Sequence, residues 1–259
     1  MKVELISYSQ QTEGCRCSGT TLLDQVAFCA RVSNPSNQNN TETTEKLVRY
    51  LIKNKHWSPF EMVNICLEIT TTRDIARQIL RHRSFSFQEF SQRYANPTET
   101  LSWNTRRARM QDPKNRQNST ETSNHDIEMI WHDMQHGIIE RSKAVYDWAI
   151  SKGIAKEQAR VVLPEGIIES RIYMNGTLRS WIHYIQLRSG NGTQKEHQEV
   201  AVACAKAIEK IFPMINEFVD QSTKGAPVAP AGGNVGIGFA VPSAMARAVT
   251  EQIVRHDDK

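Results

Sequence analysis

The chain has 259 residues, of which 39% are hydrophobic and 23% charged, and its formal net charge at pH 7 is +4. That length favours one domain with a short tail. No stretch approaches the roughly 20 apolar residues that span a bilayer, and Glu4 interrupts any signal peptide, so we expect a cytoplasmic protein. The five cysteines show no Cys-x-x-Cys spacing, which favours reduced thiols over a disulfide frame or a zinc ribbon.

The first third of the chain shows clear apolar periodicities. Residues 2–8 predict a short strand, and residues 21–32 and 42–55 predict two helices. Ser58-Pro59-Phe60-Glu61 predicts a short turn capped by the Ser58 hydroxyl. From Val63 apolar and polar residues alternate, which predicts a strand with one buried face.

Helical spacing follows from Arg73 to Arg83, and it places Arg77, Gln78 and Arg81 on one face. Residues 95–125 are polar and rich in Asn, Thr and Arg, which predicts a long loop.

A long amphipathic helix is expected over 126–151, with apolar residues recurring from Ile127 to Val145. A shorter helix should end at Leu163-Pro164.

The last third of the chain contains two further helix starts. Residues 167–174 predict a strand, Asn175-Gly176 a turn, and Thr177 the cap of a helix. Thr193 and Glu196 have the spacing of a capping box before one more helix. After residue 220 the chain becomes rich in Gly, Ala and Pro, so we expect a domain over 1–220 and a tail over 221–259.

Positive charge is concentrated between residues 73 and 116, where nine Arg and one Lys face four acidic residues. Its densest part is Arg81-His82-Arg83, followed after seven residues by Ser91 and then Arg93. Adjacent cationic groups repel one another unless an anion relieves them, and Glu89 alone cannot neutralise the cluster. Since Arg offers a planar fork to phosphate oxygens, the cluster predicts a phosphate-bearing ligand. A solvated basic face is the alternative.

Four segments in order resemble the flavin-dependent thymidylate synthases, the ThyX family. The first is Gln78 to Tyr94, which carries the Arg-His-Arg signature with its following Ser. The others are His56-Trp57-Ser58-Pro59-Phe60-Glu61, Ala159-Arg160-Val161-Val162-Leu163-Pro164 and the helix end Tyr184-Ile185-Gln186-Leu187-Arg188. The resemblance covers residues 1–219.

The resemblance implies a single-domain α+β fold with long helices packed on a mainly antiparallel sheet, assembled as a homotetramer with shared active sites. It implies reductive methylation of dUMP to dTMP, with FAD as cofactor and with NADPH and 5,10-methylenetetrahydrofolate as co-substrates. Implied flavin contacts are His56, Ser58, Arg81, His82, Arg83, Glu89, Thr177, Leu178, Arg179 and His183. Implied dUMP contacts are Gln78, Ile79, Leu80, Arg81, Glu89, Phe90, Ser91, Gln92, Arg93, Arg160 and Arg188.

By the same resemblance Arg188 is the catalytic residue, because a guanidinium beside the uracil ring can stabilise negative charge that develops there. No enzyme thiol is needed. Ser91 has no evident His–carboxylate pair, so a contact to phosphate or base suits it better than a nucleophilic role.

Two rival interpretations remain. His132 and His136 lie four residues apart on the long predicted helix, with His125 nearby, but the Glu of a zinc-hydrolase motif is missing, so solvated or packed histidines are favoured over a metal site.

Trp103 and the basic residues 106–116 could form a nucleic-acid arm. A single aromatic residue favours instead a solvated loop near an anionic site, and some of its cations could contact NADPH or folate.

Overall fold

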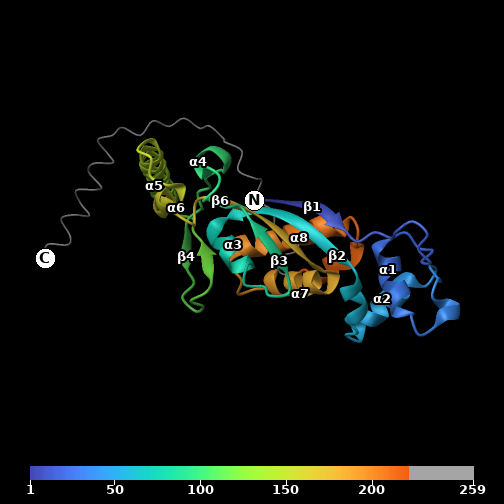
Figure 1. The fold of residues 1–259 in the computed structure, drawn as a ribbon. Coiled ribbons are helices and arrows are strands. Elements are labelled where there is room, and N and C mark those ends of the chain that lie inside the picture. The colour runs from blue at the N-terminus through green and yellow to red at the C-terminus, as the bar shows by residue number, and fades with distance from the viewer. Residues whose placement is uncertain (222–259) are drawn as a thin grey trace. The chain divides into compact units, whose positions relative to one another are not determined.

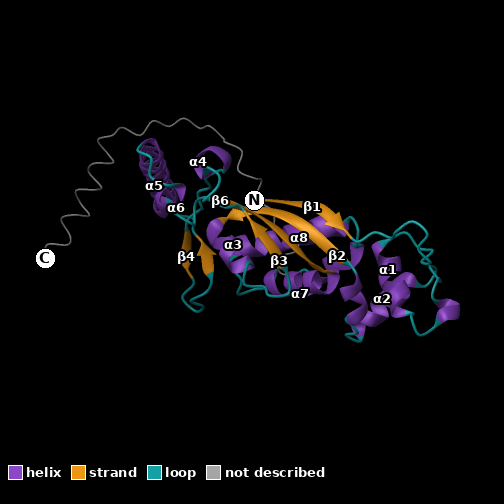
Figure 2. Cartoon of the chain, viewed as in Figure 1, coloured by secondary structure: helices purple, strands orange, loops and turns teal. Residues whose placement is uncertain are grey.

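The structure, a computed structural model, describes residues 1–221, and the predicted tail lies outside them apart from its first residue. Figures 1 and 2 show an α+β arrangement in which helices lie against one face of a sheet, as expected. The elements are β1 (Lys2–Tyr8), α1 (Leu22–Ala30), η1 (Pro35–Asn37), α2 (Thr44–Lys53), η2 (Ser58–Met62), β2 (Asn64–Thr72), α3 (Arg73–Ile79), β3 (Ser86–Glu89), α4 (Pro97–Thr100), β4 (Arg109–Gln111), β5 (Ser119–Glu121), α5 (His125–Ser151), α6 (Lys156–Ala159), η3 (Arg160–Val162), β6 (Glu169–Thr177), α7 (Leu178–Arg188), α8 (Lys195–Glu209) and η4 (Pro213–Phe218).

The main sheet has the strand order β1-β2-β6-β3, and all its pairs are antiparallel. Its buried face comes from the alternation that the sequence predicts: Ile65, Leu67 and Ile69 of β2 are fully buried. They belong to one core with apolar residues of β6 and of the helices α3, α7 and α8. These helices therefore have fixed positions on one side of the sheet, and they carry most of the site.

The predicted turn at Asn175-Gly176 is wrong, because β6 continues through both residues to Thr177. Asn175 pairs with Cys66 and Gly176 with Ile65 across β2. Glycine is needed at 176 for packing, since an added Cβ would lie 2.4 Å from a ring carbon of Phe85. The close approach of an aromatic ring accounts for this glycine, which the dipeptide pattern assigns to a turn.

Two predicted helix caps are also wrong. Ser58 lies inside η2, where Trp57 occupies the cap position and makes no side-chain cap bond. Gln194, and not Thr193, precedes α8, and the Glu196 carboxylate accepts hydrogen bonds from Gln194 and Arg109. With Glu196 engaged in this way, the reciprocal bond of a capping box does not form. The cap predicted at Thr177 is confirmed, since its hydroxyl accepts the Ser180 N–H.

The helix predicted over 73–83 ends earlier, at Ile79. The Arg81 and His82 N–H groups bond back to Gln78 and Ile79, so the chain makes a tight turn there. Arg81, His82 and Arg83 therefore extend from a turn between α3 and β3. The long loop predicted over 95–125 is replaced in part by α4 and by the hairpin β4–β5.

Helix α5 forms where it is expected, but its apolar stripe is not buried within the chain. Ile127, Ile130, Trp131, Met134 and Ile138 are each 38–46% exposed. The residues that α5 buries instead include Gln135, Ile139, Tyr146 and Ala149. Among residues 1–221, no helix is both long and apolar enough to cross a membrane.

Candidate active site

Helix α7 organises the site, because it carries expected contact residues at both ends. Near its N-terminal end, Arg179 forms an ion pair with Glu61 of η2, and the His183 ring lies edge-on to Trp57, with ring centroids 5.0 Å apart. His56 and Ser58 are exposed at the start of the same segment. The structure therefore brings the His56–Ser58 segment and the first half of α7 together.

Near its C-terminal end, α7 places Arg188 against the Arg-His-Arg turn. Arg188 Nε donates to His82 Nε2 over 2.9 Å. Burial, with the nearby charges of Arg188 and Arg81, lowers the pKa of His82 to about 4. The ring is therefore neutral at neutral pH and can accept a hydrogen bond from the Arg188 Nε–H, which leaves both terminal nitrogens of this guanidinium for a ligand.

A buried polar layer lies behind this pair. The His82 ring is edge-on to Tyr184, with centroids 4.9 Å apart, and the Tyr184 hydroxyl lies 3.1 Å from His197 Nε2. His197 Nδ1 in turn lies 3.2 Å from Oε1 of Gln78, which is an expected dUMP contact. Gln78 is thus joined to the His82–Arg188 pair through two side chains that the resemblance does not assign.

The remaining expected nucleotide contacts follow β3. Glu89 accepts a hydrogen bond from the Ser170 hydroxyl at 2.8 Å and lies 3.6 Å from Arg73, so its charge is partly used within the chain. Gln92 is buried, and its Nε2 has no hydrogen-bond partner in the described part of the chain. Arg93 lies 3.7 Å from Glu157 and lines an open hollow of about 270 Å³ with Tyr94 and residues 155–157.

Two residues expected to contact ligands have side chains that are buried and so cannot reach a ligand. Ile79 and Leu178 are fully buried in the main core. The Leu178 N–H also bonds to the Val63 carbonyl. Any contact from these two positions must use other backbone atoms, so their place in the family motif reflects packing of α3 and α7.

The arginines of the 106–109 segment differ in their contacts from four arginines of the family motifs. Arg106, Arg107 and Arg109 each pair with a carboxylate: Asp74 at 2.7 Å, Glu128 at 3.0 Å, and Glu196. Within residues 1–221, the side chains of Arg81, Arg83 and Arg160 have no carboxylate within ion-pair distance, and Arg188 bonds only to the neutral His82. Four of the arginines that the motifs assign to ligands are therefore uncompensated, which suits an anionic ligand, whereas two others, Arg93 and Arg179, are paired with Glu157 and Glu61.

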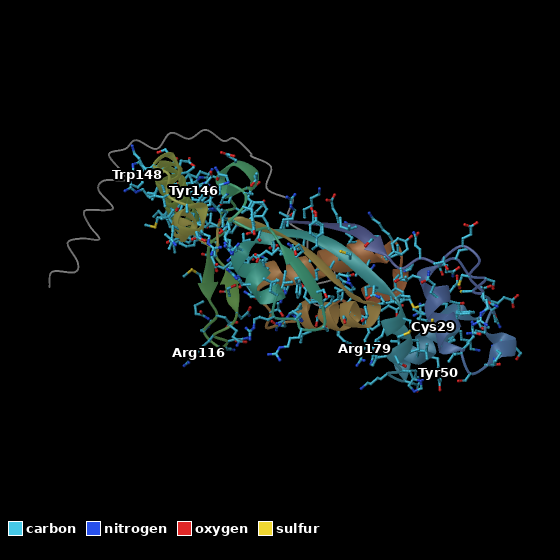
Figure 3. All side chains as sticks on the ribbon, in the orientation of Figure 1. Cys29, Tyr50, Arg116, Tyr146, Trp148 and Arg179 are labelled. Atoms are coloured by element: carbon cyan, nitrogen blue, oxygen red, sulfur yellow. The ribbon has the colours of Figure 1, made fainter. Side chains whose placement is uncertain are left out.

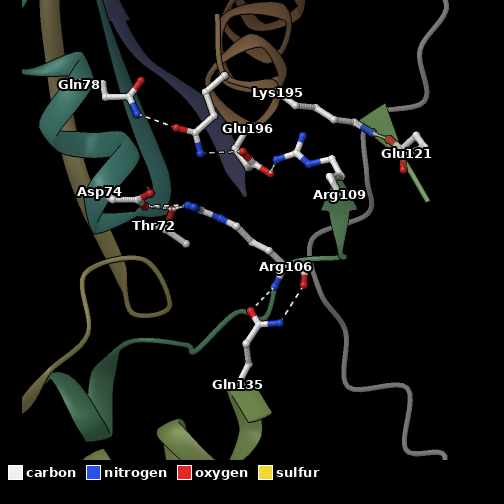
Figure 4. A network of polar contacts seen from close by, with 10 residues as sticks. Thr72, Asp74, Gln78, Arg106, Arg109, Glu121, Gln135, Lys195 and Glu196 are labelled. Carbon is white, nitrogen blue, oxygen red and sulfur yellow. Dashed lines mark hydrogen bonds and ion pairs between the residues drawn. The ribbon is translucent and has the colours of Figure 1, made fainter. Parts of the chain in front are cut away.

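The paired arginines fasten the 95–125 segment to the core (Figure 4). Arg106 bonds to Asp74 and Thr72 of the β2–α3 junction, and its backbone bonds to Gln135 of α5. Arg109 and Glu121 of the hairpin pair with Glu196 and Lys195 of α8. This segment is therefore built into the fold, and the prediction of a long loop is wrong for the parts that form α4 and the β4–β5 hairpin.

The same contacts bear on the nucleic-acid interpretation. Trp103 has a buried indole nitrogen, and Lys143 lies over its ring at 5.3 Å, so the ring is engaged within the chain. Lys114 and Arg116 in the hairpin turn are exposed (Figure 3). With Arg106, Arg107 and Arg109 also engaged, the aromatic and basic groups proposed for a nucleic-acid arm are mostly tied to the protein.

Residues for metal or thiol chemistry are sparse. His132 and His136 face each other with their Nε2 atoms 3.1 Å apart, but the described residues contain no group of three or more ligands placed to hold a metal ion. Burial raises the pKa of the thiols of Cys17, Cys29, Cys66 and Cys204, which weakens them as nucleophiles.

Several residues of the site escape sequence reasoning. His197 lies in an apolar helix stripe, where the pattern suggests only core packing. Gln194 lies outside the motifs, and Trp57 and Glu61 are in a family segment without an assigned role. A buried histidine between apolar positions is a usable signal, since such a group needs hydrogen-bond partners inside the protein.

Comparison with known proteins identifies the family. Residues 20–214 match the family model described as "Thymidylate synthase complementing protein". The chain is 48% identical over 221 residues to a protein of Paramecium bursaria Chlorella virus 1 named "Probable flavin-dependent thymidylate synthase", covering 85% of this chain and 99% of the relative. It is 50% identical over 190 residues to a flavin-dependent thymidylate synthase of Synechocystis sp., covering 73% of this chain and 86% of the relative.

A solved structure is similar as well. The UMP/dUMP methylase PolB of Streptomyces cacaoi, bound with 5-Br dUMP, aligns with a TM-score of 0.67 and 26% identity, over 84% of this chain and 93% of that one. The family model and these relatives show that the chain belongs to the family of flavin-dependent thymidylate synthases.

Proposed function

We propose that this enzyme methylates dUMP to dTMP with FAD as cofactor, with NADPH as reductant and with 5,10-methylenetetrahydrofolate as carbon donor, releasing tetrahydrofolate. The observation that carries the proposal is that four arginines of the family motifs, Arg81, Arg83, Arg160 and Arg188, have no carboxylate within ion-pair distance among residues 1–221. The family and the similarity to a methylase solved with a dUMP analogue support the choice of nucleotide.

The nucleotide would be held by groups that come from three parts of the chain. Gln78 lies in the last turn of α3, Ser91 to Arg93 follow β3, and Arg160 begins η3. Arginine forks and the Ser91 hydroxyl suit the phosphate, and the unpartnered Gln92 Nε2 supplies a further donor. An anion bound there would add a partner for Arg160, which has no carboxylate within ion-pair distance among residues 1–221, and would compete with Glu157 for Arg93.

The flavin would be held by the Arg-His-Arg turn together with His56, Ser58, Arg179 and His183. These residues suit an anionic dinucleotide, because the exposed cations Arg81 and Arg83 belong to the turn, and hydroxyl and imidazole groups come from the adjacent 56–58 segment and α7. When bound, reduced flavin supplies the hydride that converts the transferred carbon to a methyl group.

Arg188 is the residue proposed for catalysis. His82 accepts the Nε–H, so the guanidinium plane is fixed from behind and its terminal N–H groups are directed outward. A guanidinium fixed in this way can stabilise negative charge that develops on the uracil carbonyl without reorganising during the reaction. Removing the hydrogen bond from His82 would leave the charge present but less well aimed.

The active unit is proposed to be a homotetramer in which subunits share the site. Helix α7 is 11 residues long, so the residues at its two ends lie about 15 Å apart, and within one chain they form separate groups. The exposed apolar stripe of α5 also supports contact with another copy, since monomeric proteins rarely expose such a continuous stripe.

The test is an absorption spectrum of the purified protein, followed by anaerobic addition of NADPH and then of dUMP with the folate. We expect a flavin spectrum that NADPH bleaches, and dTMP that forms only when both substrates are present. A protein that takes up no FAD at micromolar concentration would contradict the proposal.

Sedimentation of the active species tests the tetramer, and an active monomer would refute that part of the proposal.

A further inference from the structure

His197 of α8 is fully buried, and it lies directly behind Gln78 and Tyr184. A buried imidazole whose nitrogens have no partners costs free energy, so its two contacts are informative. The Nδ1 atom lies 3.2 Å from Gln78 Oε1, and the Nε2 atom lies 3.1 Å from the Tyr184 hydroxyl. Both ring nitrogens are therefore satisfied inside the protein.

Tyr184, His197, Gln78 and Gln194 form a chain of hydrogen bonds, and the direction of each bond follows from the next one. Gln78 Nε2 donates to Gln194 Oε1 at 2.8 Å, so the carbonyl oxygen of Gln78 faces His197 and needs a donor. His197 must then carry its proton on Nδ1, and its Nε2 accepts from Tyr184. Burial, together with the charge of Arg188, lowers the pKa of His197 to about 3, which keeps the ring neutral.

The chain of contacts ends at a fixed charge. Gln194 Nε2 donates to Glu196 Oε2 at 2.9 Å, and Arg109 of the hairpin pairs with the other oxygen of that carboxylate (Figure 4). Each link thus donates in the same direction, from Tyr184 toward Glu196. A flipped Gln78 amide would place N–H against N–H at His197 and carbonyl against carbonyl at Gln194, so one orientation is strongly favoured.

We propose that His197 is a positioning residue, which holds the Gln78 amide in the one orientation that the uracil nucleotide requires. In this orientation Gln78 keeps one N–H and one lone pair free for a ligand. A flipped amide would exchange donor and acceptor and so mismatch the ligand. The proposal rests on the proposed function, since it takes dUMP as the ligand of Gln78.

Three variants of the FAD-loaded enzyme separate the two contacts of His197. His197→Asn keeps a nitrogen donor near the Nδ1 position, His197→Gln keeps a polar atom near Nε2, and His197→Leu keeps neither. Calorimetric titration with dUMP should give near wild-type affinity for His197→Asn. For His197→Gln and His197→Leu it should give affinity about tenfold weaker, because the Gln78 carbonyl is left unpaired and free to flip.

Two controls distinguish positioning from packing. Cys204→Ala alters another fully buried residue of α8 and should lower thermal stability while leaving dUMP affinity unchanged. In a Gln78→Leu background, His197→Leu should weaken binding no further, because His197 acts through Gln78. Equal loss in His197→Asn and His197→Leu, or an undiminished effect in the Gln78→Leu background, would overturn the proposal.

Nitrogen NMR of the His197 ring tests the same idea without a ligand or a variant. The shifts should report a neutral ring protonated on Nδ1, whereas a ring protonated on Nε2 would refute the orientation argued for Gln78. This measurement stands even if a variant fails to fold. If the wild-type holoenzyme does not bind dUMP, the proposed function fails separately, and the NMR result still decides the amide orientation.

Discussion

Two arginine-rich segments of this enzyme look alike in sequence and differ in their contacts. The segment 106–109 carries three arginines, and each is paired with a carboxylate of another element. The turn 81–83 carries two arginines around a neutral histidine, with no carboxylate within ion-pair distance of either among residues 1–221. Positive charge in the first segment therefore stabilises the fold, and in the second it is available to a ligand.

The largest effect should come from substituting Arg188, which resembles Arg81 and Arg83 in having no carboxylate within ion-pair distance among residues 1–221. Arg188→Lys keeps the charge but loses the planar fork and the bond to His82, so turnover of the bound complex should fall by roughly 10²–10³. Single-turnover kinetics at saturating dUMP measures this loss. Arg160→Ala is the matched comparison, and it should mainly raise the dUMP dissociation constant. Wild-type turnover in Arg188→Lys would remove the catalytic assignment.

Arg81→Ala tests whether the uncompensated turn binds ligand. A charge-assisted hydrogen bond contributes about 1.5–3 kcal/mol, so FAD or dUMP affinity should fall about 10- to 100-fold. The melting temperature of the protein without ligand should stay within error of wild type, since Arg81 pairs with no carboxylate in the described chain. A large loss of stability with unchanged affinity would place Arg81 in the structural class.

Arg109→Ala should have the opposite profile. Removing it leaves the half-buried Glu196 without its cation and loosens the hairpin, which should lower the free energy of unfolding by about 2 kcal/mol. Chemical denaturation measures the loss, and limited proteolysis within residues 109–121 should accelerate. Arg107→Ala is the control, because its exposed pair with Glu128 should contribute less than about 1 kcal/mol. Equal effects of the two changes would argue against the hairpin clamp.

Sequence periodicity predicted most of the sheet and of the helices that hold the site. The alternation from Val63 to Ile69 and the apolar stripe of α7 are buried as expected. These predictions succeed because a buried face must be apolar at a fixed period. The motifs also named Arg81, His82 and Arg188, two of which are in direct contact.

What the sequence did not predict depends on long-range contacts. Gly176 looks like a turn residue until the Phe85 ring is placed against it. The pairing of Arg109 with Glu196 spans 87 positions, so no local pattern distinguishes it from a free cation. The exposed stripe of α5 was predicted to be apolar, but periodicity alone does not say whether the same chain or another copy covers it.

The prediction with the smallest effect at neutral pH concerns how protonation of His82 and His197 changes the free energy of unfolding. The folded protein lowers the pKa of His82 from 6.5 to about 4 and that of His197 to about 3. In the unfolded chain both rings gain a proton as the pH falls below about 6.5, whereas in the folded protein they do not. The free energy of unfolding should therefore be unaffected above pH 7 and should decrease as the pH falls from 6.5 toward 4.

His183, whose pKa is also lowered by burial and by Arg179, acts in the same direction and window. Carboxylates with lowered pKa, such as Asp74 and Glu196, also lose stabilising charge on acidification, but at lower pH, so the range from 6.5 to 5 reports mainly on the histidines. Denaturation of wild type, His82→Gln and His197→Asn at pH 7, 6 and 5 gives the slopes. Each variant should show a shallower dependence than wild type, because one ring that resists protonation has been removed. Identical slopes in all three proteins would mean that neither imidazole is held neutral by the fold, and the bond from Arg188 to His82 would then lack its acceptor.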